Sequence, residues 1–567
     1  MVQYKVVRLA VVALMCAAPM LSQELRGTVR GEVSDSSGAV AVGAKVLLRN
    51  VNTNIERPLT SNTAGVYVFD YVSPGTYTIT VTLDGFRSYV QENILVQTRG
   101  DITVNARLEV GGVTETVRVT EAPVAVQFNK ATMETTLDTK MTNSLPLINR
   151  HPILLLQIDP QVVFTSTSAE QSPYHHWAGS RLDVGGGTEL KNDILIDGSP
   201  NTWGPKTNYV PAMDAVSEVN VQQNATDAEF GHSAGGIISL QMKSGTNEWH
   251  GTAYFFGRNP KLNALANRIT RSPNVVRHNV WGVTGSTPIK KNKLFNFFAY
   301  EGQNLREPVD QILTLPTGLE RTGDFSQSRN INGGLRAIYD PMTTQFNSAA
   351  NTSTRTPFAG NIIPASRIDP TSARFLKDVW QPNNAGDDIT NSRNYKNTFP
   401  RIYEYYNWSD RVDWNVNDAW KIFGRFSRLH TNVRSPNPSG TPAGSTGGSE
   451  RNSLTAAGDV VWTINPRIVF NIRGSYNKPV DRFIDPVVEV KDYENFWPGN
   501  PWFQSYGSRI PQQYYPGVAV GGSGFGRGSY WYSAPDFWNI QSKVSMQMGR
   551  HYVKVGGEFR QIGRAHV

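Results

Sequence analysis

Long segments of alternating polarity constrain the fold of this chain more than any other feature. Residues 467–477 place apolar side chains such as Phe470 on one face and polar ones such as Arg473 on the other, and residues 538–548 repeat the pattern. One apolar and one polar face suit a barrel with lipid outside and water inside. A soluble sandwich would bury the apolar face, but its strands are usually shorter. The alternation therefore predicts a mainly β fold that contains an antiparallel outer-membrane β-barrel.

The composition agrees with a β-rich chain. Aromatic residues make up 10% of the sequence and glycine occurs 50 times, as expected for strands joined by many turns. After the N-terminus, no run approaches the roughly 18 apolar residues of a membrane helix. The formal charge of +8 comes from scattered Lys and Arg. Since no nucleic-acid-binding motif accompanies this charge, we expect no nucleic-acid partner.

The first 23 residues have the pattern of a signal peptide. Lys5 and Arg8 provide the positive start, and residues 9–18 form an apolar core that is too short to span a bilayer. We expect cleavage near Ser22 or Gln23. Export from the cytoplasm follows from this prediction.

Cysteine chemistry is excluded for the mature chain. The only cysteine, Cys16, lies within the predicted signal peptide, and Met15 before it is too bulky for a lipoprotein cleavage site. Disulfides, thiolate metal sites and a Cys nucleophile are therefore not expected. No HExxH motif occurs, so a zinc peptidase is not expected either. We expect no enzyme activity, no metal and no cofactor.

Residues 24–112 predict a small β-sandwich. Turn residues separate short alternating runs, a spacing that favours about seven strands. The expected strands are Arg30–Ser34, Lys45–Asn50, Val66–Asp70, Tyr77–Thr82 and Ile102–Glu109. The motifs at 31–35, 43–46, 65–69, 72–77 and 85–86 resemble the carboxypeptidase regulatory-like domain, a transthyretin-like fold. The resemblance implies a spacer or a carbohydrate-binding module.

Residues 113–246 predict an α+β plug. An apolar run at 153–158 is expected to form a short helix that ends before Pro160, and strands are expected at 192–198, 216–222 and 237–242. An Asp-Gly turn should follow the first of these strands. The order of motifs over 216–259 resembles the plug of TonB-dependent receptors of the Oar-like branch.

That resemblance implies a coupling segment. Thr116, Val117, Arg118, Val119 and Thr120 stand where such receptors carry the TonB box. A box of this kind must be extended and poorly anchored, because it adds a strand to its partner.

Residues 247–561 predict part of a barrel with long loops at 305–400, 434–452 and 478–535. Motifs such as 297–302 and 360–368 resemble the Oar-like barrel. About nine or ten strands are expected, against about 22 in plugged outer-membrane transporters. Residues 562–567 resemble the translation of a sequencing adapter, so we expect the gene fragment to end near Gln561.

The resemblance implies energy-coupled import across the outer membrane. Its partners would be outer-membrane lipid, a TonB-type protein and an unidentified small-molecule, carbohydrate or peptide ligand, with the sandwich in the periplasm. Ligand contacts are expected from His175, His176, Trp177 and Trp203, although these residues also suit ordinary loop packing. The alternative classes are a secreted carbohydrate-binding or adhesion protein and a carboxypeptidase-like enzyme.

Overall fold

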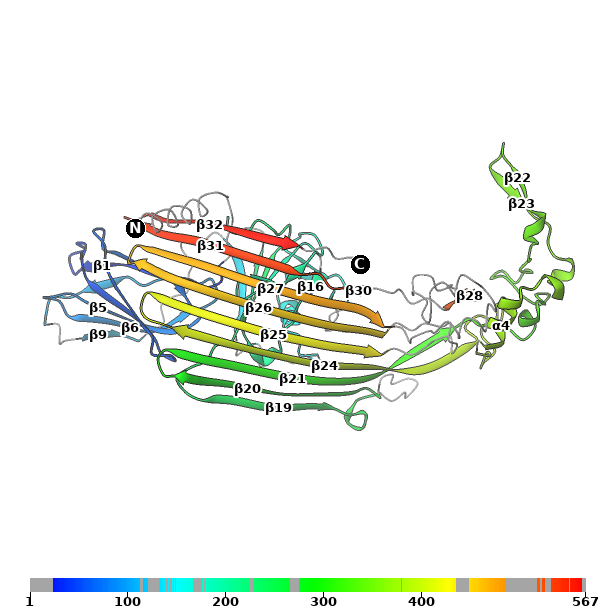
Figure 1. The fold of residues 1–567 in the computed structure, drawn as a ribbon, viewed down its shortest axis with the longest axis horizontal. Coiled ribbons are helices and arrows are strands. Elements are labelled where there is room, and N and C mark those ends of the chain that lie inside the picture. The colour runs from blue at the N-terminus through cyan, green and yellow to red at the C-terminus, as the bar shows by residue number, and fades with distance from the viewer. Residues whose placement is uncertain are drawn as a thin grey trace, which may run out of the picture.

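The computed structural model divides the chain into a sandwich, a plug and a large sheet (Figure 1). It describes residues 24–562 except 113–115, 121–131, 139–140, 142–144, 146, 148, 167–175, 178, 205, 224–227, 266–274, 379, 435–447, 485–517, 521–522, 526–531 and 550. The predicted signal peptide, His175 and the last five residues lie outside this description. No helix among the described residues has both the length and the apolar character needed to cross a membrane.

The sandwich consists of two sheets around one apolar core. The first sheet contains β4 (Val66–Val72), β1 (Gly27–Asp35), β7 (Asp101–Thr103) and β8 (Ala106–Leu108). The second has the order β3 (Glu56–Thr60), β2 (Lys45–Asn50), β5 (Gly75–Thr82), β6 (Ser88–Val96) and β9 (Thr116–Val119). The core lies between them and includes Val29, Val46, Phe69 and Ile79. Alternation of buried and partly exposed residues, as in β5, places each apolar side chain in this core.

Two details of the sandwich differ from the prediction. The expected strand Ile102–Glu109 is two short strands, β7 and β8, which both pair with β1 in parallel. Strands β3 and β6 were not predicted. Pro58 argues against a strand in β3, but proline is tolerated there because β3 is at the edge of its sheet.

The plug is built on a mixed five-stranded sheet. Its order is β10 (Met133–Asp138), β17 (Val216–Gln223), β18 (Ile237–Met242), β13 (Asp193–Ile196) and β14 (Ser199–Pro200). Two antiparallel strand pairs accompany it, namely β11 (Val162–Phe164) with β12 (Leu182–Val184) and β15 (Thr202–Trp203) with β16 (Lys206–Thr207). The helix expected at 153–158 is a 3₁₀ helix, η1 (Pro152–Ile158), and a second one is η2 (Met213–Ala215).

The large sheet is an antiparallel meander of long strands. Its order is β19 (His250–Arg258), β20 (Arg277–Lys290), β21 (Leu294–Leu313), β24 (Tyr395–Asn415), β25 (Trp420–Arg434), β26 (Gly448–Asn465), β27 (Ile468–Ile484), β31 (Phe537–Met548) and β32 (His551–Ile562), and β30 (Tyr532–Ser533) pairs with β27. The sandwich lies at one end of these strands, and the long excursion between β21 and β24 extends from the other end (Figure 1).

The remaining short elements lie outside these three units. They are β22 (Gln345–Asn347), β23 (Thr352–Thr354), β28 (Val518–Val520), β29 (Ser523–Phe525), α4 (Pro370–Asp378) and the 3₁₀ helices η3 (Pro260–Leu262), η4 (Glu320–Thr322), η5 (Pro341–Thr343), η6 (Ala359–Asn361) and η7 (Ala365–Arg367). The predicted loop 305–400 was too long, because β21 and β24 pair from Leu294↔Trp414 to Leu313↔Tyr395. The predicted loop 434–452 ends too late, because β26 begins at Gly448. The predicted loop 478–535 begins too early, because β27 extends to Ile484.

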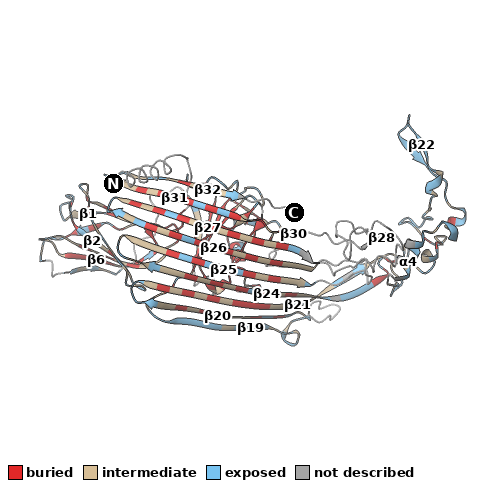
Figure 2. Ribbon diagram, viewed as in Figure 1, coloured by how far each residue is buried: buried red, intermediate tan, exposed pale blue. Residues whose placement is uncertain are grey.

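In the large sheet the polar side chains are buried and many apolar side chains are exposed, the reverse of the pattern in a soluble protein. In β27 the polar face is buried, with Asn471 and Arg473 1% and 2% exposed, whereas Ile472 is 39% exposed. In β31, Trp538 and Ile540 are 52% and 53% exposed, while Gln541 is buried. Figure 2 shows this alternation along the strands. The buried polar face contacts the plug, as in the barrel predicted from the alternation, and the apolar face is left for lipid.

Candidate functional site

The predicted ligand-binding residues meet on the plug, near the end of the sheet from which the long loops extend. His176 and Trp177 precede β12, and Trp203 lies in β15. The imidazole centroid of His176 is 5.5 Å from the Trp177 ring and 6.0 Å from the Trp203 ring. The structure thus brings three of the four predicted residues together, and His175 lies outside the described residues.

Lys206, which sequence reasoning missed, is part of the same cluster. Its ammonium nitrogen is 4.3 Å from the Trp203 ring centroid and 5.4 Å from that of Trp177. Aromatic rings attract a cation placed over their faces. Burial lowers the pKa of Lys206, while Asp481 of β27 opposes this shift. The two tryptophan rings therefore pack against the Lys206 ammonium group of the plug.

The cluster contacts the large sheet, which is called the barrel wall from here on. His176 is hydrogen-bonded through Nδ1 to Asp481, and Arg451 Nε lies 3.8 Å from the same carboxylate. Burial lowers the pKa of His176, and Asp481 again opposes the shift. Trp203 and His176 are buried, whereas Trp177 remains partly exposed. Among the described residues, Trp177 is thus the predicted residue best placed to contact a ligand.

A second set of contacts joins the plug to the wall through Asp197. This residue begins the predicted Asp-Gly turn between β13 and β14, where Asp197 and Gly198 have φ values of 49° and 76°. Arg411 donates to Asp197 Oδ1 at 2.8 Å, and Arg425 lies 3.5 Å from Oδ2. A Cβ on Gly198 would lie 1.8 Å from Arg473 Nη1, so the turn approaches the wall as closely as only glycine allows.

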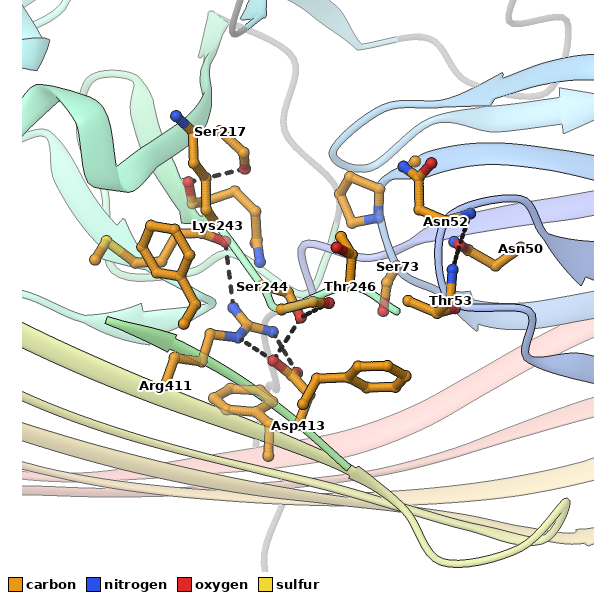
Figure 3. A pocket seen from close by; sticks show the side chains of 18 of the residues that line it. Asn50, Asn52, Thr53, Ser73, Ser217, Lys243, Ser244, Thr246, Arg411 and Asp413 are labelled. Atoms are coloured by element: carbon orange, nitrogen blue, oxygen red, sulfur yellow. Dashed lines mark hydrogen bonds and ion pairs between the residues drawn. The ribbon is translucent and has the colours of Figure 1, made fainter. Parts of the chain in front are cut away.

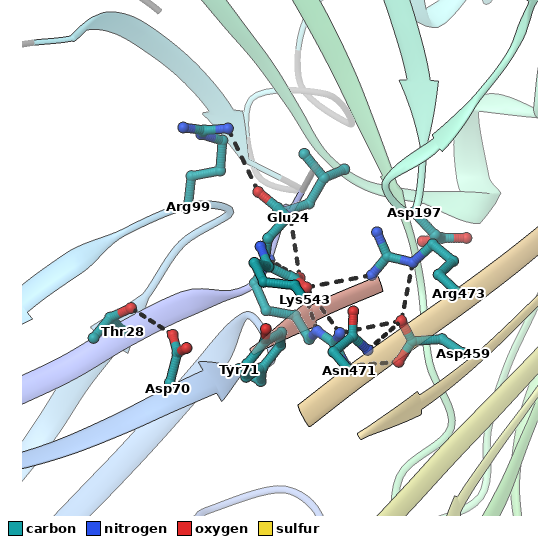
Figure 4. A network of polar contacts seen from close by, with 12 residues as sticks. Glu24, Thr28, Asp70, Tyr71, Arg99, Asp197, Asp459, Asn471, Arg473 and Lys543 are labelled. Carbon is teal, nitrogen blue, oxygen red and sulfur yellow. Dashed lines mark hydrogen bonds and ion pairs between the residues drawn. The ribbon is translucent and has the colours of Figure 1, made fainter. Parts of the chain in front are cut away.

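A third set of contacts joins the first residues of the sandwich to both the plug and the wall (Figure 4). Arg26 and Arg473 both pair with Asp459 at 3.0 Å, and Arg473 also lies 3.6 Å from Glu24. Burial alone would raise the pKa of Glu24, but Arg26 and Arg473 hold it well below its usual value. Leu25 packs in one cluster with Leu195, Phe230 and Ile237 of the plug.

The inward-facing arginines were not predicted as site residues. Arg411, Arg425, Arg451 and Arg473 occupy polar positions of alternating strands, and all four are buried. Charged residues on the lumen side of a strand were the available signal in the sequence. Their partners could not be read from it, because Arg411 and Asp197 are 214 residues apart.

The predicted coupling segment is extended but not loose. Strand β9 (Thr116–Val119) pairs in parallel with β6, from Ser88↔Thr116 to Gln91↔Val119. Val119 packs against the sandwich core, and Arg118 forms an exposed ion pair with Glu92 at 3.3 Å. Asn93 also donates to the Thr120 carbonyl at 3.1 Å. The expectation of poor anchoring therefore needs correction, since the sandwich holds this segment along one edge.

No group of three or more metal-ligating side chains is gathered within the described part of the chain.

The chain belongs to the outer membrane beta barrel domain family, whose model matches residues 241–566. A second model, the carboxypeptidase regulatory-like domain, matches residues 28–109. The predicted resemblance to TonB-dependent receptors is confirmed, and the chain is an outer-membrane protein. It is 24% identical over 341 residues to the TonB-dependent transporter Oar of Myxococcus xanthus, a match that covers 56% of this chain and 31% of that protein.

Solved structures that match part of the chain include a siderophore receptor and an outer membrane transporter. The siderophore receptor PirA from Acinetobacter baumannii is 12% identical with a TM-score of 0.41, covering 75% of this chain and 47% of that one. The outer membrane transporter YddB from Escherichia coli is 11% identical with a TM-score of 0.42, covering 73% and 45%. The chain thus spans about a third of the curated relative and less than half of these structures.

Proposed function

We propose that the protein takes part in energy-coupled uptake of a ligand through a plugged barrel in the outer membrane. The observation that carries this proposal is the buried polar face of the sheet, which pairs with the plug through Asp197 and Arg411 at 2.8 Å. An apolar cluster also joins the plug to Phe297, Tyr405 and Leu429 of the wall. The ion pairs can part when water solvates both charges. Uptake requires such a separation.

We further propose β9 as the segment that a TonB-type protein engages. Its outer edge has no neighbouring strand among the described residues, so a partner strand can add there. Thr116 and Arg118 are exposed on this strand. Tension on β9 would reach the sandwich through β6 and the plug through the chain that follows Thr120. The sandwich would then lie in the periplasm and move with the plug.

Ligand contacts are proposed at Trp177, on the partly exposed side of the Lys206 cluster. The ligand class stays open among small molecules, carbohydrates and peptides. We infer no catalytic role for the chain, and hydrolysis of a peptide substrate by the purified protein would contradict this. A secreted carbohydrate-binding or adhesion protein is not favoured, because the exposed apolar face of β27 and β31 suits lipid rather than water.

A disulfide-capture experiment tests the coupling proposal. Arg118→Cys is expressed in cells together with a TonB-type protein carrying one cysteine in its strand-forming segment. The matched control is Arg107→Cys, which places the thiol on the exposed side of β8 in the other sheet. Capture at position 118 but not at 107 is expected. Equal capture at both positions, or none at either, would overturn the assignment of β9.

A further inference from the structure

A cavity of about 940 Å³ lies where the sandwich, the plug and the barrel wall meet, at the end of the sheet opposite the long loops. Its volume is within the usual range of small-molecule sites. Figure 3 shows side chains from all three units around it, namely Asn50, Asn52, Thr53 and Ser73 of the sandwich, Ser217, Lys243, Ser244 and Thr246 of the plug, and Arg411 and Asp413 of the wall.

Most charges that line this cavity already have partners. Arg411 pairs with Asp197 and Asp413, at 2.8 and 2.9 Å. Arg26 and Arg473 share Asp459, as described above. These pairs are complete in themselves and leave no charge for a ligand.

Three lining cations, Arg57, Lys421 and Lys243, form no ion pair with any residue that the structure describes, and the first two interact electrostatically. Arg57 of β3 lines it from the sandwich, and Lys421 lines it from the start of β25. The Arg57 guanidinium makes one hydrogen bond, from Nη1 to the Asp70 backbone carbonyl at 2.7 Å, and lies 5.6 Å from the Phe69 ring centroid. Lys421 has no hydrogen bond or ion pair from its amino group to any residue that the structure describes. Both side chains are only partly exposed.

The nearby carboxylates Asp70 and Asp418 act electrostatically on this pair but form no ion pair with it. Asp70 accepts from the Thr28 hydroxyl at 3.0 Å and lies 4.0 Å from Lys554. Asp418, within electrostatic range of Lys421, belongs to the exposed turn between β24 and β25 and forms no ion pair with it. Arg57 itself acts electrostatically on Lys421. Two like charges therefore face one partly enclosed space, an arrangement that costs free energy unless an anion lies between them.

We propose that this cavity binds a small phosphate- or carboxylate-bearing molecule, with its anionic group between Arg57 and Lys421. The guanidinium presents a planar fork of donors that matches two oxygens of such a group, and the ammonium supplies a second, compact charge. The bound anion would join the sandwich to the barrel wall. Nothing in this site depends on the uptake proposal, since neither residue contacts β9 or the Lys206 cluster.

Calorimetric titration of the purified full chain in detergent tests the site, with inorganic phosphate and citrate as the two probes. Saturable binding of at least one probe is expected. Arg57→Gln and Lys421→Gln should each weaken it about tenfold or more. Lys45→Gln and Lys291→Gln are matched controls, because both lysines are exposed and neither lines the cavity. Binding of phosphate alone or of citrate alone would identify which anion the site prefers.

Charge-preserving variants separate a binding defect from a folding defect. Without added anion, Lys421→Gln should keep or raise the thermal midpoint, since it removes a repulsion. Arg57→Lys and Lys421→Arg should retain most of the binding that the glutamine variants lose. The proposal is overturned if neither probe binds, if the glutamine variants bind like the unaltered chain, or if the charge-preserving variants lose binding as completely as the glutamine variants.

Discussion

Arg411 of the barrel wall donates from Nη1 to the carboxylate of Asp197 in the plug across 2.8 Å, and both side chains are buried. Arg425 lies 3.5 Å from the other carboxylate oxygen. One plug carboxylate therefore contacts two wall cations in a place with little access to water, and Arg411 pairs with Asp413 as well. Removing one partner from such a group leaves an uncompensated buried charge. The free-energy cost of that charge exceeds the net stabilisation that the intact group provides.

Asp197→Asn should for this reason lower the free energy of unfolding by about 3 kcal/mol. Arg411 would keep Asp413, but Arg425 would lose its only ion-pair partner among the described residues. Denaturant unfolding in micelles measures the change. Asp310→Asn is the control, since Asp310 is exposed and accepts from Thr398 at the surface. A similar small effect for both variants would contradict the role assigned to Asp197.

Gly198→Ala should be more destabilising than Gly549→Ala. Both glycines have positive φ, at 76° and 59°, so both substitutions carry a backbone cost of about 1 kcal/mol. Only the Cβ at position 198 would meet another group, Arg473 Nη1 at 1.8 Å, whereas the space at 549 is open. The difference between the thermal unfolding midpoints of the two variants measures the cost of the steric contact between position 198 and Arg473. Equal shifts would show that Arg473 moves aside without cost.

Glu218 should make stability depend on pH. It accepts two hydrogen bonds from Thr98, from the backbone N–H at 2.6 Å and from the hydroxyl at 2.5 Å. Burial raises the pKa of Glu218 above its usual value, so folding favours the protonated acid. The stabilisation is then complete below the ordinary carboxyl pKa of about 4.3 and is lost as the pH rises through the raised native value.

Glu218→Gln keeps an acceptor for Thr98 and removes the titration. Relative to the unaltered chain, this variant should have equal stability at pH 4 and higher stability at pH 8. Unfolding midpoints at the two pH values give the comparison. A difference that does not change with pH would rule out titration of Glu218 as the cause.

The two tryptophans of the Lys206 cluster should respond differently to truncation. Trp203 is buried against Phe537 and Lys206, so Trp203→Ala should cost about 3 kcal/mol of stability. Trp177 is partly exposed, and Trp177→Ala should cost less than about 1 kcal/mol. Chemical denaturation distinguishes them. If Trp177→Ala proved the more destabilising, Trp177 would be a packing residue and not a candidate for ligand contact.

Local pattern alone predicted the features that depend on neighbouring residues. Alternation in 467–477 and 538–548 predicted β27 and β31, and their inward polar faces, because side chains in a strand point to opposite sides in turn. The Asp-Gly turn at 197–198 was also predictable, because the two residues themselves set its backbone conformation.

Local pattern also misplaced the strand ends. Pro308 and Pro400 lie within the predicted loop 305–400, yet they are register partners in the extended parts of β21 and β24. Strand β20 pairs with β21 only as far as Arg306, and β25 pairs with β24 only from Ile402 onward. Neither proline therefore has a strand on its outer side that would need a backbone N–H donor. Pairing with a distant strand overrode the local signal.

The coupling segment shows the same limit. Residues 116–119 read as an extended stretch, and the structure confirms that much, but their pairing with β6 was not visible because it depends on which sheet edge lies within reach. Pairings of this kind, like that of Asp197 with Arg411, join residues far apart in the chain. Sequence sets the chemistry of each partner, whereas only the folded chain sets their distance, and electrostatic and hydrogen-bond energies depend on that distance.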